Sequence, residues 1–217
     1  MISPRNSSAG GASRGANSSA GTPKGVTAEE VVLLDDEGNA IGTAPKADVH
    51  GTDTPLHLAF SCYVFDEDAR LLVTQRALAK PTFGGVWTNS CCGHPAPGEP
   101  IAEAVARRTG QELGLDLEDV RLVLPAFRYR AVGDNGTVEN ELCPVFTAIA
   151  SGDPHPDATE VEAWEWVAWP QFRDDVLRRR REVSLWCQEQ VEALPEDPMS
   201  APAADPALLP PAARIAT

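Results

Sequence analysis

The chain has 217 residues, a length that suits one domain, and its hydrophobic share of 42% is enough for a sizeable core. Its 18 basic and 32 acidic residues give a net charge of −14, which argues against nucleic acid as a partner because phosphate-backbone binding needs a basic face. No apolar stretch approaches the ~20 residues that a membrane helix needs, so we expect no membrane partner either.

Both ends of the chain have the composition of tails. Residues 1–25 are mostly Ser, Gly and Ala without an apolar signal-peptide core, and they predict a disordered N-terminal tail. Residues 195–217 are rich in Pro and Ala and predict a C-terminal tail, which leaves residues 26–194 as the folded domain. The five cysteines are an odd number in a chain too long to need disulfide staples, so we expect free thiols and a cytoplasmic protein.

The first part of the domain has the pattern of β-strands. Val31–Asp35 predicts a short strand that is followed by a turn at residues 36–39. His57–Phe65 and Leu71–Thr74 are rich in β-forming residues and flank the polar break Asp66–Arg70, so they predict a hairpin.

A loop and a helix follow this hairpin. Residues 81–98 contain several prolines and glycines and predict a segment that is mostly loop. Pro100–Leu113 predicts a helix, because proline fits the first turn and Gly114 can end it.

The last part of the domain again predicts strands, with a helix at its end. Strands are expected near residues 120–131 and 137–149, joined by the turn residues 133–136. Residues 160–169 alternate in polarity and predict another strand, and Pro170–Leu194 predicts a final helix. Strands on both sides of a central helix predict an α/β (α+β) sandwich.

Two short segments carry residues suited to catalysis. In Trp87–Pro95, only a glycine separates Cys92 from His94. Glu139 and Glu141 are two residues apart on a predicted strand, and since side chains alternate along a strand, both point to one face. A thiol, an imidazole and two carboxylates are the parts of a metal-assisted acid/base site.

The stretch that starts at Gly93 resembles the Nudix box, a loop–helix module that presents carboxylates to a metal holding a diphosphate. The matching positions are Gly93, Glu99, Arg107, Glu112 and Gly114. Two positions that hold glutamate in the hydrolase box are Arg108 and Gln111 here, which argues against diphosphate hydrolysis. The plain alternative is an exposed helix with an Arg108–Glu112 ion pair.

A wider set of motifs resembles the type I isopentenyl-diphosphate isomerases, which have the Nudix fold but do not hydrolyse their substrate. The matching segments, in chain order, are Leu56–Ser61, Leu72–Ala77, Trp87–Pro95, Phe127–Arg130 and Val138–Phe146. The resemblance runs from about residue 31 to residue 191 and implies a Nudix-like sandwich of mixed β-sheets flanked by helices. It implies an isomerase that interconverts isopentenyl and dimethylallyl diphosphate through a tertiary carbocation, in isoprenoid precursor biosynthesis and without a flavin.

The resemblance also implies roles for individual residues. Proton transfer would fall to Cys92, Glu141 and Tyr129. One divalent metal would be held by His50, His57, His94, Glu139 and Glu141, and nitrogen ligands suit Mn²⁺ or Zn²⁺ better than Mg²⁺. Mg²⁺ would bind Glu112 and the backbone carbonyl of Cys92, together with the substrate diphosphate. The substrate itself would contact Lys46, Arg76, Lys80, Arg108 and Trp186.

Other interpretations stay open at this point. The chain could be a Nudix diphosphohydrolase acting on a small organic diphosphate, or a non-catalytic module that binds a divalent metal or a prenyl diphosphate. Trp186 could be a core residue, and Cys91, next to Cys92, is expected only to pack in the core. We expect a small-molecule prenyl diphosphate as the partner and a monomeric protein.

Overall fold

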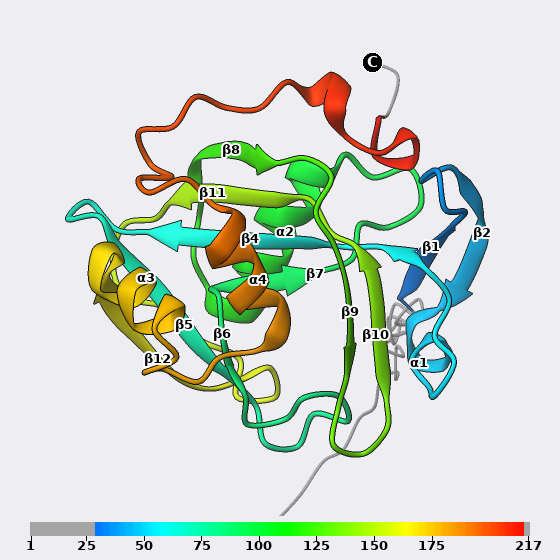
Figure 1. Cartoon of the computed structure of the whole chain (residues 1–217), viewed down its shortest axis with the longest axis horizontal. Coiled ribbons are helices and arrows are strands. Elements are labelled where there is room, and N and C mark those ends of the chain that lie inside the picture. The colour runs from blue at the N-terminus through cyan, green and yellow to red at the C-terminus, as the bar shows by residue number, and fades with distance from the viewer. Residues whose placement is uncertain (1–28, 215–217) are drawn as a thin grey trace, which may run out of the picture.

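The computed structural model describes residues 29–214, which form two mixed β-sheets flanked by helices (Figure 1). The first sheet has the order β2 (Ala40–Pro45), β1 (Glu30–Leu34), β3 (His57–Leu58), β10 (Val138–Leu142) and β9 (Arg128–Val132). The second has the order β12 (Val161–Ala168), β5 (Arg70–Arg76), β4 (Phe60–Phe65), β11 (Val145–Ile149) and β8 (Glu118–Leu124). Two short strands, β6 (Trp87–Thr88) and β7 (Cys91–Gly93), pair with β5 and β4.

Helices cover both faces of the second sheet. The helices are α1 (Lys46–Val49), α2 (Ile101–Leu113), α3 (Trp169–Leu177) and α4 (Leu185–Ala193). Along β4, Phe60 and Val64 belong to the core cluster that contains α2, whereas Tyr63 and Phe65 belong to the cluster that contains α3 and α4. This alternation makes β4 a strand buried on both faces. The predicted sandwich of mixed sheets flanked by helices is therefore confirmed.

The long strands predicted from the sequence each divide in two, and the two halves lie in different sheets. The run at 57–65 divides at Ala59 into β3 and β4, and the run at 137–149 divides at Cys143–Pro144 into β10 and β11. The two breaks lie side by side, since Ala59 N donates to Leu142 O at 3.0 Å. Proline has no N–H for a sheet ladder, so a continuous strand through residue 144 would lose a hydrogen bond.

The third of these divisions separates β8 from β9. A single strand near 120–131 was expected, but β8 ends at Leu124 and β9 begins at Arg128. β8 pairs with β11 in one sheet, and β9 pairs with β10 in the other. Pro125 follows directly after β8 and has no N–H for a sheet ladder, so this division, like the one at Pro144, falls at a proline.

The predicted final helix is also two helices. α3 ends at Leu177, and Arg179 has a left-handed backbone conformation with φ 56°, which an α-helix does not tolerate. α4 begins after Ser184, whose hydroxyl accepts a hydrogen bond from Cys187 N at 3.3 Å. Ser184 N also donates to Trp87 O at 2.8 Å, so α4 is fixed directly beside β6.

The Pro- and Ala-rich C-terminal segment, expected to be a tail, packs on the domain as far as residue 214. It passes over the upper edge of the molecule in Figure 1 and includes the short 3₁₀ helices η1 (Pro206–Leu208) and η2 (Pro211–Ala213). Leu209 and Ala213 are buried in the same core cluster as Val32. The N-terminal tail predicted at residues 1–25 lies outside the described residues. Between residues 29 and 214, no helix combines the length and apolar character that crossing a membrane requires.

Candidate active site

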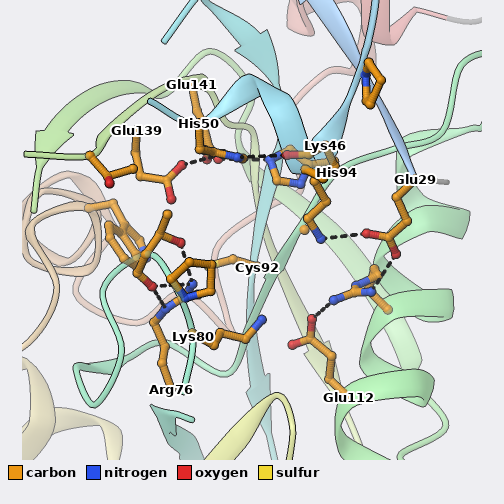
Figure 2. A pocket seen from close by; sticks show the side chains of 18 of the residues that line it. Glu29, Lys46, His50, Arg76, Lys80, Cys92, His94, Glu112, Glu139 and Glu141 are labelled. Atoms are coloured by element: carbon orange, nitrogen blue, oxygen red, sulfur yellow. Dashed lines mark hydrogen bonds and ion pairs between the residues drawn. The ribbon is translucent and has the colours of Figure 1, made fainter. Parts of the chain in front are cut away.

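A cavity of about 460 Å³ lies where the two sheets, α1, α2 and α4 meet (Figure 2). Every site residue predicted above lines this cavity except His57, which is fully buried beside it. The residues come from separate parts of the chain, from Lys46 in α1 to Trp186 in α4. The fold therefore brings the predicted residues together in one place.

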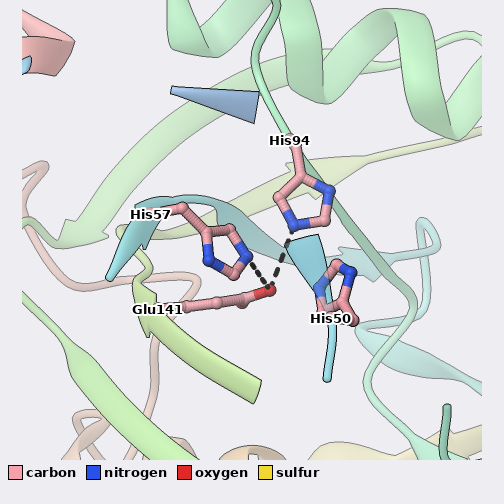
Figure 3. Close-up of side chains that lie close together, drawn as sticks. All are labelled: His50, His57, His94 and Glu141. Atoms are coloured by element: carbon pink, nitrogen blue, oxygen red, sulfur yellow. Dashed lines mark hydrogen bonds and ion pairs between the residues drawn. The ribbon is translucent and has the colours of Figure 1, made fainter. Parts of the chain in front are cut away.

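A cluster of three histidines and one glutamate lies at one side of the cavity (Figure 3). One ligand atom from each of His50, His57, His94 and Glu141 lies within 4.8 Å of all the others. His94 Nε2 is 3.1 Å and His57 Nε2 is 3.5 Å from Glu141 Oε1. His57 and Glu141 are neighbours because β3 and β10 pair in parallel with these two residues in register.

The geometry of this cluster fits a divalent cation. The Nδ1 atoms of His50 and His57 lie 3.3 Å and 2.9 Å from the backbone carbonyls of Lys46 and Pro55, which turns both Nε2 atoms toward the cluster. Those Nε2 atoms are buried and have no hydrogen-bond partner among residues 29–214. A metal ion bound to them would satisfy these nitrogens, so the donor set suits a cation that accepts imidazole ligands.

Glu139 and Glu141 point to the same face of β10, as strand geometry requires. Glu139 Oε2 lies 3.0 Å from His50 Nε2. Burial opposes ionisation of Glu141, but its contacts with the imidazoles of His57 and His94 hold its pKa well below the ordinary value. The hydroxyl of Tyr129 donates to Glu141 Oε2 at 2.8 Å, and burial raises the pKa of this phenol well above its usual range. Glu141 is thus an ionised carboxylate that accepts a hydrogen bond from a neutral phenol.

Cys92 presents its thiol to the cavity from β7. Its Sγ lies 3.3 Å from Ser61 Oγ on the paired strand β4 and donates to Asn89 Oδ1 at 3.3 Å. Burial raises the pKa of Cys92 to about 11, so the sulfur carries a proton at neutral pH. The neighbouring Cys91 faces the core instead, as expected. Gly93 follows, and a Cβ there would lie only 3.0 Å from side-chain atoms of Arg108 and Phe60.

Positive side chains gather at another part of the cavity. Lys46, Arg76, Lys80 and Arg108 all line it, as does Glu112. Arg108 is only 7% exposed and forms an ion pair with Glu112, so this face of α2 is buried and the interpretation as an exposed helix is wrong. A clustered set of cations beside one carboxylate suits a diphosphate accompanied by a hard metal ion.

Glu29 lines the same part of the cavity, although no motif in the sequence indicated a role for it. Its carboxylate lies 2.7 Å from Lys46 Nζ and 3.0 Å from Arg108 Nη1. Burial raises the pKa of Glu29, but the hydrogen bond and charge of Lys46, with the charge of Arg108, lower it below the usual value. Glu29 is therefore an ionised group bridging two of the predicted anion-binding residues.

Aromatic rings form the apolar wall of the cavity. The ring of Trp186 lies 5.6 Å from that of Tyr129 and 5.2 Å from that of Phe83, and the guanidinium of Arg76 lies 5.9 Å from it. Trp186 Nε1 donates to Asn89 Oδ1 at 3.3 Å. The core interpretation of Trp186 is thus incomplete, since this buried residue also faces the cavity.

Comparisons with known proteins show what the chain is similar to. The NUDIX domain family matches residues 55–187, more than half of the chain. The isopentenyl-diphosphate Delta-isomerase of Saccharopolyspora erythraea is 56% identical over 87% of this chain and 98% of its own length. The isopentenyl-diphosphate Delta-isomerase of Rhizobium rhizogenes is 51% identical over 88% of this chain and 94% of its own. A crystal structure of a Deinococcus radiodurans protein aligns with a TM-score of 0.59 and 16% identity, over 76% of this chain and 99% of that one, which indicates a shared fold.

Proposed function

Because the chain belongs to the isopentenyl-diphosphate Delta-isomerase family of Nudix proteins, we propose that it interconverts isopentenyl diphosphate and dimethylallyl diphosphate. The observation that carries this proposal is one cavity holding a thiol, a phenol-supported carboxylate, an aromatic wall and a cluster of cations. The alternative function, Nudix diphosphohydrolase, is not favoured, since Arg108 and Gln111 replace two box glutamates and the relatives are named as isomerases.

The reaction makes specific demands on the site. Moving the double bond adds a proton at one carbon and removes one at another, through a tertiary carbocation that water would capture. The site must therefore exclude water, hold an acid and a base in position, and stabilise positive charge without offering a nucleophile. The side chains that face the hydrocarbon part of the substrate have to meet these requirements.

We assign the two proton transfers to Cys92 and Glu141. The Cys92 thiol is protonated at neutral pH and faces the cavity, so it can exchange a proton with the substrate. Glu141 exchanges the other proton, and the Tyr129 hydroxyl at 2.8 Å can relay or steady it. The direction of the reaction decides which group donates first. The Trp186 ring offers its face to the cation, a contact worth ~2 kcal/mol when desolvated.

The proposed metal ligands divide into two sets. His50, His57 and His94, with Glu139 and Glu141, would hold Mn²⁺ or Zn²⁺, supported by the unpartnered Nε2 atoms. Glu112 and the Cys92 carbonyl would hold Mg²⁺ with the substrate diphosphate. Bound ions supply positive charge that neutralises the diphosphate and tunes the acidity of Glu141.

Divalent metal should stabilise the protein through the histidine cluster. At a free Mn²⁺ or Zn²⁺ concentration 100-fold above Kd, we expect about 2.7 kcal/mol of stabilisation. For a domain of this size this corresponds to roughly 5–10 °C in the thermal midpoint. His94→Asn should lose this increase, while His155→Asn, an exposed loop histidine outside the cluster, should keep it. Calorimetry of chelator-treated and metal-reloaded protein measures both, and equal increases in both variants would contradict the ligand assignment.

Glu29 should compete with the substrate diphosphate. Its carboxylate bridges Lys46 and Arg108, two cations that we assign to the diphosphate, so the substrate must displace it. We expect Glu29→Gln to lower KM about 2- to 5-fold, the equivalent of roughly 0.5–1 kcal/mol for a half-exposed ion pair. Steady-state kinetics measures this, and Glu30→Gln on the exposed part of β1 is the control. A raised KM would mean that Glu29 instead holds the cations in position for the substrate.

The proposed function is tested by incubating the protein with isopentenyl diphosphate and Mg²⁺ in D₂O, followed by NMR. We expect dimethylallyl diphosphate with deuterium incorporated from the solvent. Release of phosphate would favour the hydrolase, and metal or substrate binding without proton exchange would favour a binding module. We further propose that the protein is a monomer. A reducing, cytoplasmic environment is proposed as well, which the five free cysteines, all within the described residues, support.

A further inference from the structure

We propose that Asn89 is a positioning residue that fixes, through one amide group, both the Cys92 thiol and the Trp186 indole against the substrate. This inference rests on the proposed isomerase function. Asn89 lies between β6 and β7, is 0% exposed, and does not line the main cavity. It therefore acts on the chemistry only through the groups that it holds.

The main chain determines the orientation of the Asn89 amide. Its Nδ2 donates to the carbonyls of Cys62 and Cys91, at 3.1 and 3.0 Å. Because a carbonyl can only accept, the nitrogen must face these two groups, and Oδ1 must face the other way. The acceptor end of the amide is thus directed toward the cavity side of the fold.

Oδ1 receives hydrogen bonds from two residues that we assign to catalysis. Cys92 Sγ donates to it at 3.3 Å, and Trp186 Nε1 donates to it at 3.3 Å. Thr88 Oγ1 donates to the same atom at 2.9 Å. A single oxygen therefore links β7, which carries the thiol, to α4, which carries the ring.

The backbone around Asn89 is itself held firmly. Thr74 Oγ1 donates to Asn89 O at 2.9 Å, and the next residue, Ser90, donates to Leu72 O at 2.6 Å and accepts from Val64 N at 2.7 Å. These bonds tie the Asn89–Ser90 corner to both β4 and β5. A rigid supporting shell of this kind is what keeps catalytic groups in a productive geometry.

The proposed diphosphate ligands have hydrogen-bond partners elsewhere. Lys46 and Arg108 pair with Glu29, and Arg76, whose guanidinium lies 5.9 Å from the Trp186 ring, is held by its own hydrogen bond to Thr82 O at 3.0 Å. Loss of the Asn89 amide should consequently release the Cys92 thiol and the Trp186 indole, which face the hydrocarbon part of the substrate. Binding of the diphosphate part should stay nearly unchanged. A displacement of about 1 Å at the reacting groups costs on the order of 100-fold in rate.

Asn89→Ala is expected to lower kcat about 100-fold with KM within about 3-fold of wild type. The matched control is Thr88→Val, which removes another buried donor to the same oxygen, together with a hydrogen bond to Ser184 Oγ at 2.8 Å, while the thiol and indole donors to Oδ1 remain; its kcat should stay within about 3-fold of wild type. Circular dichroism establishes that each variant is folded.

A measurement on the wild-type protein tests the contact without any change at Asn89. The Trp186 indole N–H, assigned by its absence in Trp186→Phe, should exchange slowly with solvent in ¹⁵N NMR spectra. The reference is Trp169, whose indole donates to Glu196 O at 2.7 Å. Fast exchange of the Trp186 indole N–H with solvent would overturn the proposal. So would a folded Asn89→Ala protein whose kcat stays within about 3-fold of wild type. A loss of kcat in Thr88→Val as large as that in Asn89→Ala would also overturn it. Failure of wild-type protein to isomerise would refute the proposed function instead, and the indole measurement would still test the contact.

Discussion

Cys92→Ala should abolish isomerisation, with kcat lower by about 10⁴-fold, the upper end of what a general acid or base contributes. The sulfur is a protonated thiol facing the cavity, and alanine offers no proton there. The backbone carbonyl is kept, so Mg²⁺ and diphosphate should still bind. Turnover and deuterium exchange are measured by NMR, and substrate affinity by calorimetry.

The control for this variant is the adjacent thiol. Cys91 is buried in the core cluster, and its Sγ lies 3.6 Å from Glu112 Oε2. Cys91→Ala should lose some stability because it removes buried volume, but its kcat should stay within about 10-fold of wild type, the equivalent of about 1.4 kcal/mol. If Cys91→Ala is the inactive variant and Cys92→Ala turns over normally, the assignment of the catalytic thiol is wrong.

Glu141→Gln should remove activity and weaken the transition-metal site together. Glu141 shares Oε1 with His57 and His94 and receives the Tyr129 hydroxyl on Oε2, so one carboxylate serves both roles. We expect kcat to fall by about 10⁴-fold or more, and affinity for Mn²⁺ or Zn²⁺ to fall by at least about 100-fold. Kinetics and metal titration of the same preparation measure the two effects.

Two further variants separate the roles of this carboxylate. Glu103→Gln, on the exposed face of α2, should change neither property. Tyr129→Phe removes the hydroxyl but no metal ligand, so kcat should fall about 10²-fold while metal affinity is kept. A Glu141→Gln protein that binds metal weakly yet isomerises at the wild-type rate would show that Glu141 is only a ligand.

Much of the site could be predicted because its residues lie in short, recognisable motifs. Cys92 and His94 are separated by one glycine, and Glu139 and Glu141 share a strand face, so local sequence already groups them. The resemblance to a family then assigned Lys46, and the fold places it in the same cavity. Asn89 lay within a quoted motif but remained unassigned, because its role depends on contacts with residues distant in the chain.

Other features could not be predicted because tertiary structure determines them. Arg108 and Glu112 looked like an exposed pair at helical spacing, yet both are buried because they face a cavity that accommodates their charges. Glu29 has no motif, and only the pairing of β1 with β2, which ends at Pro45, brings it beside Lys46. The C-terminal segment buries single residues such as Leu209 and Ala213 without any periodic pattern.

Two of the strand divisions could have been found in the sequence. Pro144 follows Cys143 and Pro125 follows Leu124, and a proline in a predicted central strand argues against a continuous ladder. The division at Ala59, between β3 and β4, carries no comparable marker. Register and sheet membership therefore needed the three-dimensional structure.

The passage of two strand pairs from one sheet to the other determines how the enzyme loses activity on heating. β3 supplies His57 to one sheet and continues directly into β4 of the other, while β10 supplies Glu141 and continues into β11. Neither sheet can unfold separately without displacing the site residues that lie where these strands pass from one sheet to the other. Heating should consequently inactivate the protein and melt it in the same cooperative step, with no partly unfolded form that still turns over substrate.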